Sequence, residues 1–337
     1  MIMAEILSWA QLPKNEKQTI LTNVAEDKGI LENAVEKDFW VTMVLKAVFS
    51  QPYSDALCFK GGTSLSKGWN LIERFSEDID LAIDRRFFGF AEHLGKSQRT
   101  KLRKTSKLFV EQTLVDDVAK SLEWYGLKDK FRINVPETSE SDKDPVEFFV
   151  DYDSVLGTRN DYVQERVKLE ISCRSMFEPV RPVMMRSMID EAYPDEKFSN
   201  AQFPVSTVVP ERTFLEKIFL LHEEFNRPGG CTHLSRLTRH MYDIEKLMDT
   251  DFAYRALSDK ALYDDIIEHR REFTAWSGLD YSLHQPATIS FLPPEHIIDE
   301  LSSDYAKMQT GFIYGDSINF GELLTRLQQL QDKIRNI

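Results

Sequence analysis

The chain has 337 residues, of which 42% are hydrophobic and 11% aromatic, so its composition excludes a disordered protein and predicts a packed globular core. Its formal net charge of -13 argues against non-specific wrapping of nucleic acid, an affinity that comes mainly from neutralised phosphates, and restricts such contacts to local basic patches. No apolar run is long enough to cross a bilayer, and the first residues lack the pattern of a signal peptide, so we expect a cytoplasmic protein without membrane contact.

The first predicted elements are a helix over 30–50, whose apolar residues recur at helical spacing, and a strand in "ALCFKGG" (56–62) that ends in two glycines. A second helix is predicted in "TSLSKGWNLIERF" (63–75). The alternating polarity of "DIDLAID" (78–84) predicts the next strand. The order is therefore strand, glycine turn, helix, strand.

The middle of the chain adds a long predicted helix and three more strands of the same sheet. The helix covers 98–124, and the strands are "FRINV" (131–135), "VEFFVDYD" (146–153) and "RVKLEISC" (166–173). We therefore expect an α/β domain over 1–205, with a mixed, twisted sheet and flanking helices.

The last third of the chain is predicted to be helical. From Pro210 onward nearly every segment has helical periodicity. The predicted helices cover 211–225, 233–249, 263–276 and 321–336. We therefore expect a mainly helical C-terminal domain over 206–337 that contributes to the site.

Two aspartates, Asp78 and Asp80, lie two residues apart on one predicted strand, so both project to the same side, about 7 Å apart along the backbone. At an effective dielectric near 20 their repulsion is roughly 2 to 3 kcal/mol, which a bound divalent cation would convert into attraction. The alternative is a pair of exposed aspartates on a strand that faces water.

The glycine turn precedes these aspartates by one predicted helix. Gly61 and Gly62 close a strand and Ser64 opens the helix, so backbone N–H groups and hydroxyls would point to one spot that suits a phosphate. A tight turn that needs positive φ is the alternative. The spacing favours a phosphate cradle beside a metal site, as phosphoryl chemistry with an Mg²⁺-bound nucleotide requires.

The stretch "GGTSLSK…RFSEDIDL" resembles the signature of the DNA polymerase β-like nucleotidyltransferase superfamily, and more narrowly that of the AbiEii/AbiGii-type toxins of bacterial toxin–antitoxin systems. Four further blocks are similar to that toxin family and stand in its order. They are "EKDFWVTMVLKAVF", "VKLEIS", "RTFLEKIFLLHE" and "RHMYDIEKL". The five blocks span roughly residues 36 to 249, and the resemblance implies a nucleotidyltransferase-type sheet.

The resemblance implies the following roles in the first domain. Asp78 and Asp80 hold a metal ion, Mg²⁺ or Mn²⁺, with Glu170 of "VKLEIS" as the third carboxylate. The residues assigned to the nucleotide phosphates are Gly61, Gly62, Thr63, Ser64 and Lys67. From its strand position alone, Glu170 is as well explained by solvent exposure.

In the helical domain the resemblance implies that Lys217 neutralises phosphate charge and that Asp243 positions the acceptor or helps remove its proton. Lys217 falls within an apolar stripe, where snorkelling is the alternative. We also assign Arg239, from the polar stripe that contains Asp243, to the nucleotide. A solvated face, or a simple pair between Arg239 and Asp243, explains that stripe as well.

The segment "GKSQRTKLRKTSK" (95–107) is strongly basic within an acidic chain. Its Lys101, Arg103 and Lys104 are candidates for contacts with RNA phosphates, and a solvated helix face is the alternative.

Together these assignments predict a nucleotidyltransferase that moves NMP from an NTP to an RNA acceptor and releases pyrophosphate. The resemblance implies tRNA as the acceptor, growth arrest and phage defence as the role, and a separately encoded antitoxin protein as a partner. Two other classes stay open. One is a transferase that modifies a small molecule, as antibiotic-resistance enzymes of this fold do, and the other is a catalytically inactive binding module of the same fold.

Overall fold

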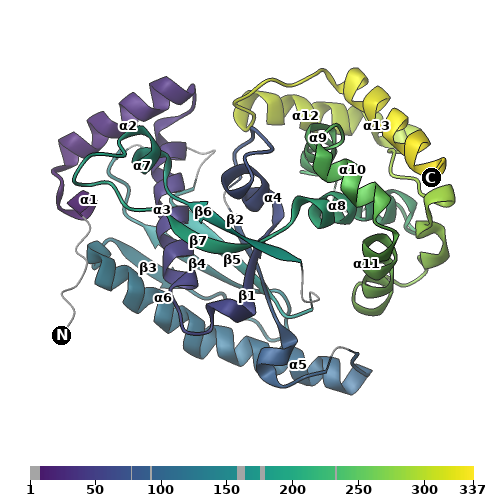
Figure 1. Cartoon of the computed structure of the whole chain (residues 1–337), viewed down its shortest axis with the longest axis horizontal. Coiled ribbons are helices and arrows are strands. Elements are labelled where there is room, and N and C mark those ends of the chain that lie inside the picture. The colour runs from purple at the N-terminus through teal and green to yellow at the C-terminus, as the bar shows by residue number, and fades with distance from the viewer. Residues whose placement is uncertain (1–7, 77, 92, 158–163, 175–178, 232–233) are drawn as a thin grey trace. The chain divides into compact units, whose positions relative to one another are not determined.

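The computed structural model describes residues 8–76, 78–91, 93–157, 164–174, 179–231 and 234–337 (Figure 1). Within it the chain forms two compact units. The first unit comprises Met1–Gly68 and Ser76–Val208, and the second comprises Trp69–Phe75 and Val209–Ile337. The chain thus passes into the second unit twice, once briefly between the glycine turn and the Asp-x-Asp strand, and once after Val208.

A seven-stranded sheet forms the centre of the first unit, in the order β3-β4-β5-β2-β1-β7-β6. β1 runs antiparallel to β2, whereas β2 runs parallel to β5, so the sheet is mixed and the predicted fold class is confirmed. The strands are β1 Leu57–Lys60, β2 Asp78–Ile83, β3 Phe131–Asn134, β4 Val146–Tyr152, β5 Arg166–Ser172, β6 Val180–Met185 and β7 Phe203–Val208.

Five of these strands were predicted, whereas β6 and β7 were not. Three of the six side chains of β6 are exposed and the strand contains Pro182, so its sequence lacks the regular alternation that predicts a strand. It pairs only with β7 at the edge of the sheet.

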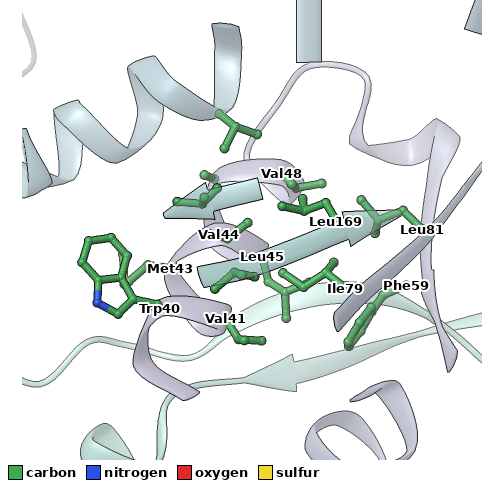
Figure 2. Close-up of a cluster of buried hydrophobic side chains, with 14 of the residues drawn as sticks. Trp40, Val41, Met43, Val44, Leu45, Val48, Phe59, Ile79, Leu81 and Leu169 are labelled. Carbon is green, nitrogen blue, oxygen red and sulfur yellow. The ribbon is translucent and has the colours of Figure 1, made fainter. Parts of the chain in front are cut away.

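Helices of the first unit cover the sheet, and α3 (Glu32–Phe49) contributes most of the core. It packs against β2, β5 and β7. Figure 2 shows its apolar side chains beside those of the strands. Val44 and Leu45 are fully buried, as is Leu169 of β5, and burial of each such side chain contributes roughly 1.5 to 3 kcal/mol. The other helices are α1 Ser8–Gln11, α2 Lys14–Lys28, α4 Gly61–Thr63, α5 Lys96–Phe109, α6 Val115–Leu122 and α7 Met188–Ala192.

The helix predicted over 63–75 is wrong beyond Gly68. α4 continues as a single π-helical stretch over Ser64–Gly68 and ends there, and Asn70 has a left-handed φ of 51°. The next residues pair with another segment instead: the Phe75 N–H donates to the carbonyl of Phe312 (2.7 Å). Tertiary hydrogen bonds have thus replaced the helical ones that the local periodicity favoured.

The second unit is helical. Its helices are α8 Pro210–Asn226, α9 Thr238–Leu247, α10 Asp251–Ser258, α11 Lys260–Phe273, α12 Ile298–Gly311 and α13 Phe320–Arg335. α9 begins later than the predicted 233, because Arg236 has a φ of 72°; residue 233 itself lies outside the described residues. No helix in the described part of the chain is both long and apolar enough to cross a membrane.

Candidate functional site

The two aspartates of β2 share the face opposite the core. Ile79 and Leu81 point into the core and are at most 1% exposed, whereas Asp78 and Asp80 alternate with them and are half-buried. On the neighbouring parallel strand, Glu170 is the register partner of Asp80. Because paired residues on adjacent strands project to the same side, all three carboxylates lie on one face of the sheet.

The glycine turn lies directly against one of these carboxylates. Gly61 has a φ of 79°, and a Cβ atom at this position would lie 1.9 Å from Oδ2 of Asp80. Lys60, the last residue of β1, is the register partner of Asp80, which explains why the turn starts beside that side chain. Only glycine fits both the backbone angle and the space.

The two hydroxyls after the glycines point inward. Thr63 is 2% exposed, and its Oγ1 donates to the main-chain carbonyl of Asp78 at 2.5 Å. Ser64 is fully buried, and its Oγ donates to the carbonyl of Gly61 at 2.9 Å. In this structure these hydroxyls therefore brace the turn against β2 and close it on itself.

Lys67 ends in a buried ion pair within the first unit. Its Nζ lies 2.6 Å from Oδ1 of Asp38 on α3 and donates to the carbonyl of Arg186 at 3.0 Å. The other oxygen of Asp38 accepts the N–H of Met188 at 2.7 Å. Both side chains are less than a tenth exposed, so the pair connects the end of the glycine turn to α3.

In the second unit, Lys217 and Asp243 are in direct contact. Nζ of Lys217 on α8 lies 2.9 Å from Oδ2 of Asp243 on α9. Arg74 completes the network with two hydrogen bonds, from Nε to Oδ1 (2.6 Å) and from Nη2 to Oδ2 (2.7 Å). Burial alone would raise the pKa of Asp243, but the charges and hydrogen bonds of Arg74 and Lys217 hold it well below its usual range.

α9 also carries His240 and Arg239. Nδ1 of His240 lies 3.5 Å from Nζ of Lys217, and burial, together with the charges of Lys217 and Arg239, lowers the pKa of His240 well below its usual value. The imidazole is therefore neutral near pH 7. Arg239 itself is half-buried.

A family model described as "Nucleotidyl transferase AbiEii toxin, Type IV TA system" matches residues 44–326, most of the chain. The chain belongs to the AbiEii family. It is thus a nucleotidyltransferase and a toxin of a toxin–antitoxin system, as its sequence blocks predicted, and the family model adds that the system is of type IV. A type IV system implies an antitoxin partner.

Two solved structures are similar to this AbiEii toxin. JHP933 from Helicobacter pylori is 15% identical with a TM-score of 0.47, over 91% of this chain and 93% of that one. MenT4, a nucleotidyltransferase toxin from Mycobacterium tuberculosis H37Rv, is 14% identical with a TM-score of 0.42, over 96% and 97% of the two chains. No curated protein matches the chain.

Asp78, Asp80 and Glu170 suit a hard divalent cation, because such ions prefer oxygen ligands and the three carboxylates share one face of two paired strands. Among the described residues, however, no three His, Cys, Asp or Glu side chains already form a metal-binding group. Lys168 accounts for part of this, since its Nζ binds the carboxylates of both Glu170 and Glu147. Burial lowers the pKa of Lys168, but these two partners more than offset that and raise it above its usual value.

The basic segment predicted to contact RNA forms α5, and its side chains differ in their surroundings. Nη2 of Arg103 lies 2.5 Å from Asp142, so this guanidinium already has a carboxylate partner. Lys101 and Lys104 are exposed, and neither forms an ion pair with any other described residue. They are the two assigned residues whose charge is most available to an external phosphate.

One residue of these networks, Asp38, was not assigned to the site from sequence. Asp38 is the last of three consecutive charged residues, Glu36, Lys37 and Asp38, that are buried within the apolar helix α3. Charges are rarely buried without partners, so such a run in an apolar helix is a usable signal. The sequence singles out Arg74 by its place just before the Asp-x-Asp strand, but its partner Asp243 is 169 residues away, and no local pattern indicates that pairing.

Proposed function

We propose that this AbiEii toxin transfers NMP from an NTP to an RNA acceptor, and that the face of β2 bearing Asp78 and Asp80 is its catalytic centre. The observation that carries this proposal is the contact of Gly61 with the Asp80 carboxylate. A phosphate held by the backbone N–H groups of the turn would meet the two aspartates directly. A strand that merely faced water would not need a glycine at this place.

Asp78 and Asp80 would hold a divalent cation, Mg²⁺ or Mn²⁺, with Glu170 as a third ligand once it exchanges Lys168 for the ion. Such an ion orients the triphosphate and stabilises the charge that develops at the α-phosphate. In the overall reaction an acceptor oxygen forms a bond to the α-phosphorus, the bond to the α–β bridging oxygen breaks, pyrophosphate leaves, and the acceptor oxygen loses its proton. The residues of the turn, Gly61 to Ser64, would orient the phosphates for this in-line attack.

In the helical unit, Lys217 is proposed to neutralise phosphate charge. Lys217 is a buried cation in direct contact with the Asp243 carboxylate, which Arg74 also binds, and a cation held in this way is suited to neutralise phosphate charge. Asp243 itself accepts hydrogen bonds on both oxygens, and its pKa is low. We therefore assign it the positioning of Lys217 and not removal of the acceptor's proton, for which its basicity is too weak. Arg239 is proposed to bind the nucleotide.

The RNA acceptor is proposed to be tRNA, which rests on the family's likeness in sequence and on the exposed lysines of α5. Phosphate contacts from Lys101 and Lys104 would orient the acceptor without reading its sequence. Growth arrest would follow from modification of the tRNA pool, and the antitoxin would relieve it.

The deciding experiment supplies the protein with each NTP, labelled at the α-phosphate, together with Mg²⁺ and total cellular RNA. We expect label in the tRNA band of a denaturing gel, and none with Asp80→Asn. Label that appears only on a small molecule would replace RNA with a small-molecule acceptor. Absence of any label transfer with all four NTPs, in Mg²⁺ and in Mn²⁺, would contradict the proposed function.

A further inference from the structure

The seven residues between the glycine turn and the Asp-x-Asp strand are part of the helical unit. The first unit contains residues up to Gly68 and resumes at Ser76, whereas Trp69–Phe75 belongs with Val209–Ile337. The glycine turn and the Asp-x-Asp strand of the proposed catalytic centre are therefore joined by a segment that packs within the helical unit. We call residues 69–75 the connecting segment.

Backbone hydrogen bonds hold the connecting segment to the residues that follow α12. The Phe75 N–H donates to the carbonyl of Phe312 (2.7 Å), and the Tyr314 N–H donates to the carbonyl of Glu73 (3.0 Å). Arg74 and Ile313 form an antiparallel bridge between these bonds. The segment is thus paired like a short strand within the helical unit.

Side chains add a second set of contacts. The ring of Trp69 packs edge-on against Phe252, with centroids 5.7 Å apart. The hydroxyl of Tyr242 lies 3.3 Å from the backbone nitrogen of Glu73, which donates to it. A Cβ on Gly315 would lie 2.5 Å from Cβ of Glu73, so the backbone of residue 315 approaches the segment as closely as a glycine allows.

Arg74 provides the strongest of these contacts. Its guanidinium makes two hydrogen bonds to Asp243, and the two residues are 4% and 0% exposed. A bidentate pair of this kind fixes both distance and orientation. Removal of the arginine would leave a buried carboxylate with Lys217 as its remaining charged partner, which is costly in a site away from water.

We propose that Arg74 is a positioning residue for the transfer reaction. Through Asp243 it fixes the connecting segment, which joins the glycine turn to the Asp-x-Asp strand along the chain, within the helical unit. The expected effect on kcat rests on the proposed function, whereas the expected effect on the hydrogen bonds of the connecting segment does not. Only three residues separate Arg74 from Asp78 along the chain, so movement at one end of this link reaches the other.

The chain offers a matched control in Arg270. Its guanidinium also binds a fully buried carboxylate, Glu223, through two hydrogen bonds, from Nε (2.6 Å) and Nη2 (2.5 Å). Both arginine–carboxylate pairs belong to the helical unit, but Glu223 and Arg270 join α8 to α11, whereas Arg74 joins the connecting segment to α9. Loss of either arginine therefore destabilises the unit, whereas only loss of Arg74 frees the segment.

The experiment compares Arg74→Met, Arg74→Lys and Arg270→Met with the wild type by hydrogen exchange and by steady-state kinetics. In Arg74→Met we expect the amides of residues 73–76 to exchange about tenfold faster than in Arg270→Met, at matched loss of global stability. We expect kcat of Arg74→Met to fall about 10²-fold, with Arg74→Lys intermediate and Arg270→Met near the wild type.

The two readouts separate the failure of this inference from that of the proposed function. If no transfer is measurable in the wild type, hydrogen exchange alone still decides whether Arg74 holds the connecting segment. Equal exchange of residues 73–76 in the two Met variants would overturn the proposal. So would an Arg74→Met enzyme that loses only as much kcat as Arg270→Met does, since Arg74 would then contribute to stability alone.

Discussion

Gly61 lies directly against the side chain of Asp80: a Cβ atom on the glycine would lie 1.9 Å from Oδ2 of the aspartate. Any side chain at position 61 would therefore displace the Asp80 carboxylate. Under the proposed function, this contact would set the distance between the phosphates bound at the turn and the carboxylates of β2.

Replacement of Gly61 by alanine should abolish transfer because the new methyl group must displace the Asp80 side chain. The matched control is Gly89→Ala. Gly89 has a nearly identical φ of 77°, but nothing lies within 4 Å of its Cβ position. Both variants should lose about 1 to 3 kcal/mol of unfolding free energy from backbone strain. Urea unfolding and label transfer measure the two effects. Equal activity in both variants would show that the contact has no catalytic role.

The shared face of Asp78 and Asp80 leads to a second prediction. Asp78→Asn and Asp80→Asn should each reduce transfer below detection while the protein stays folded, because neither side chain belongs to the core. Divalent-metal affinity, measured by calorimetry in the presence of a non-hydrolysable NTP, should fall with it. A variant that kept metal affinity and lost only activity would place the cation elsewhere.

The parts of this protein that were predictable from sequence are those whose signals are local. Alternation along β2 reports its two faces, because a strand exposes every second residue to the same side. The helix over 32–49 is equally evident, since its apolar residues follow one another along the chain. The five sequence blocks indicated the family, which the family model confirms, whereas the roles of single residues stay predictions.

The remaining features depend on contacts distant in sequence. The connecting segment has helical periodicity, yet its hydrogen bonds go to residues 312–315. Lys67 is predicted to bind phosphate, which stays a prediction, and its ion pair with Asp38, 29 residues earlier, is a contact that no local pattern indicates. Both are tertiary contacts between residues distant in sequence, and the sequence alone does not show which residues become partners.

Two roles can be distinguished for Lys67: a structural ion pair with Asp38, or a ligand of the nucleotide phosphates. A buried ion pair that loses one partner typically costs about 3 to 5 kcal/mol, so Lys67→Met and Asp38→Asn should each be destabilised by this order. The double variant should be little worse than either single one. If Lys67 instead binds phosphate, Lys67→Met should raise KM for the NTP, whereas Asp38→Asn should leave KM unchanged and lower only the stability. In the double variant the loss of affinity and the loss of stability should then both be present in full.

Acid should weaken the helical unit through His222. Burial and the charge of the adjacent His284 lower the pKa of His222 to about 4, and its Nδ1 accepts the Ser290 N–H. The fold therefore favours the neutral ring. Stability should be full above the ordinary histidine pKa of about 6.5 and should fall as the pH drops toward 4, by at most about 3 kcal/mol.

The matching variant is His222→Asn, whose amide oxygen can accept the same N–H but does not titrate. Urea unfolding between about pH 7 and pH 4.5 should show a shallower loss of stability than in the wild type, by about one proton. His240 contributes in the same direction, so some slope should persist. An unchanged slope in His222→Asn would exclude His222 as a source of the acid sensitivity.

The last prediction concerns the RNA acceptor and divides the three basic residues assigned to it. Lys101 and Lys104 are exposed on α5, whereas Arg103 is bound to Asp142. The double variant Lys101→Glu/Lys104→Glu should weaken RNA modification and flatten its dependence on salt. A protein that makes fewer phosphate contacts releases fewer counterions when it binds RNA. Arg103→Gln should mainly cost stability, since it removes the partner of Asp142. Lys120→Glu is the control, an exposed lysine on α6 that pairs with Asp116. RNA modification by the α5 double variant at the wild-type rate and salt slope would show that α5 is a solvated face, and the RNA acceptor would then have to bind elsewhere.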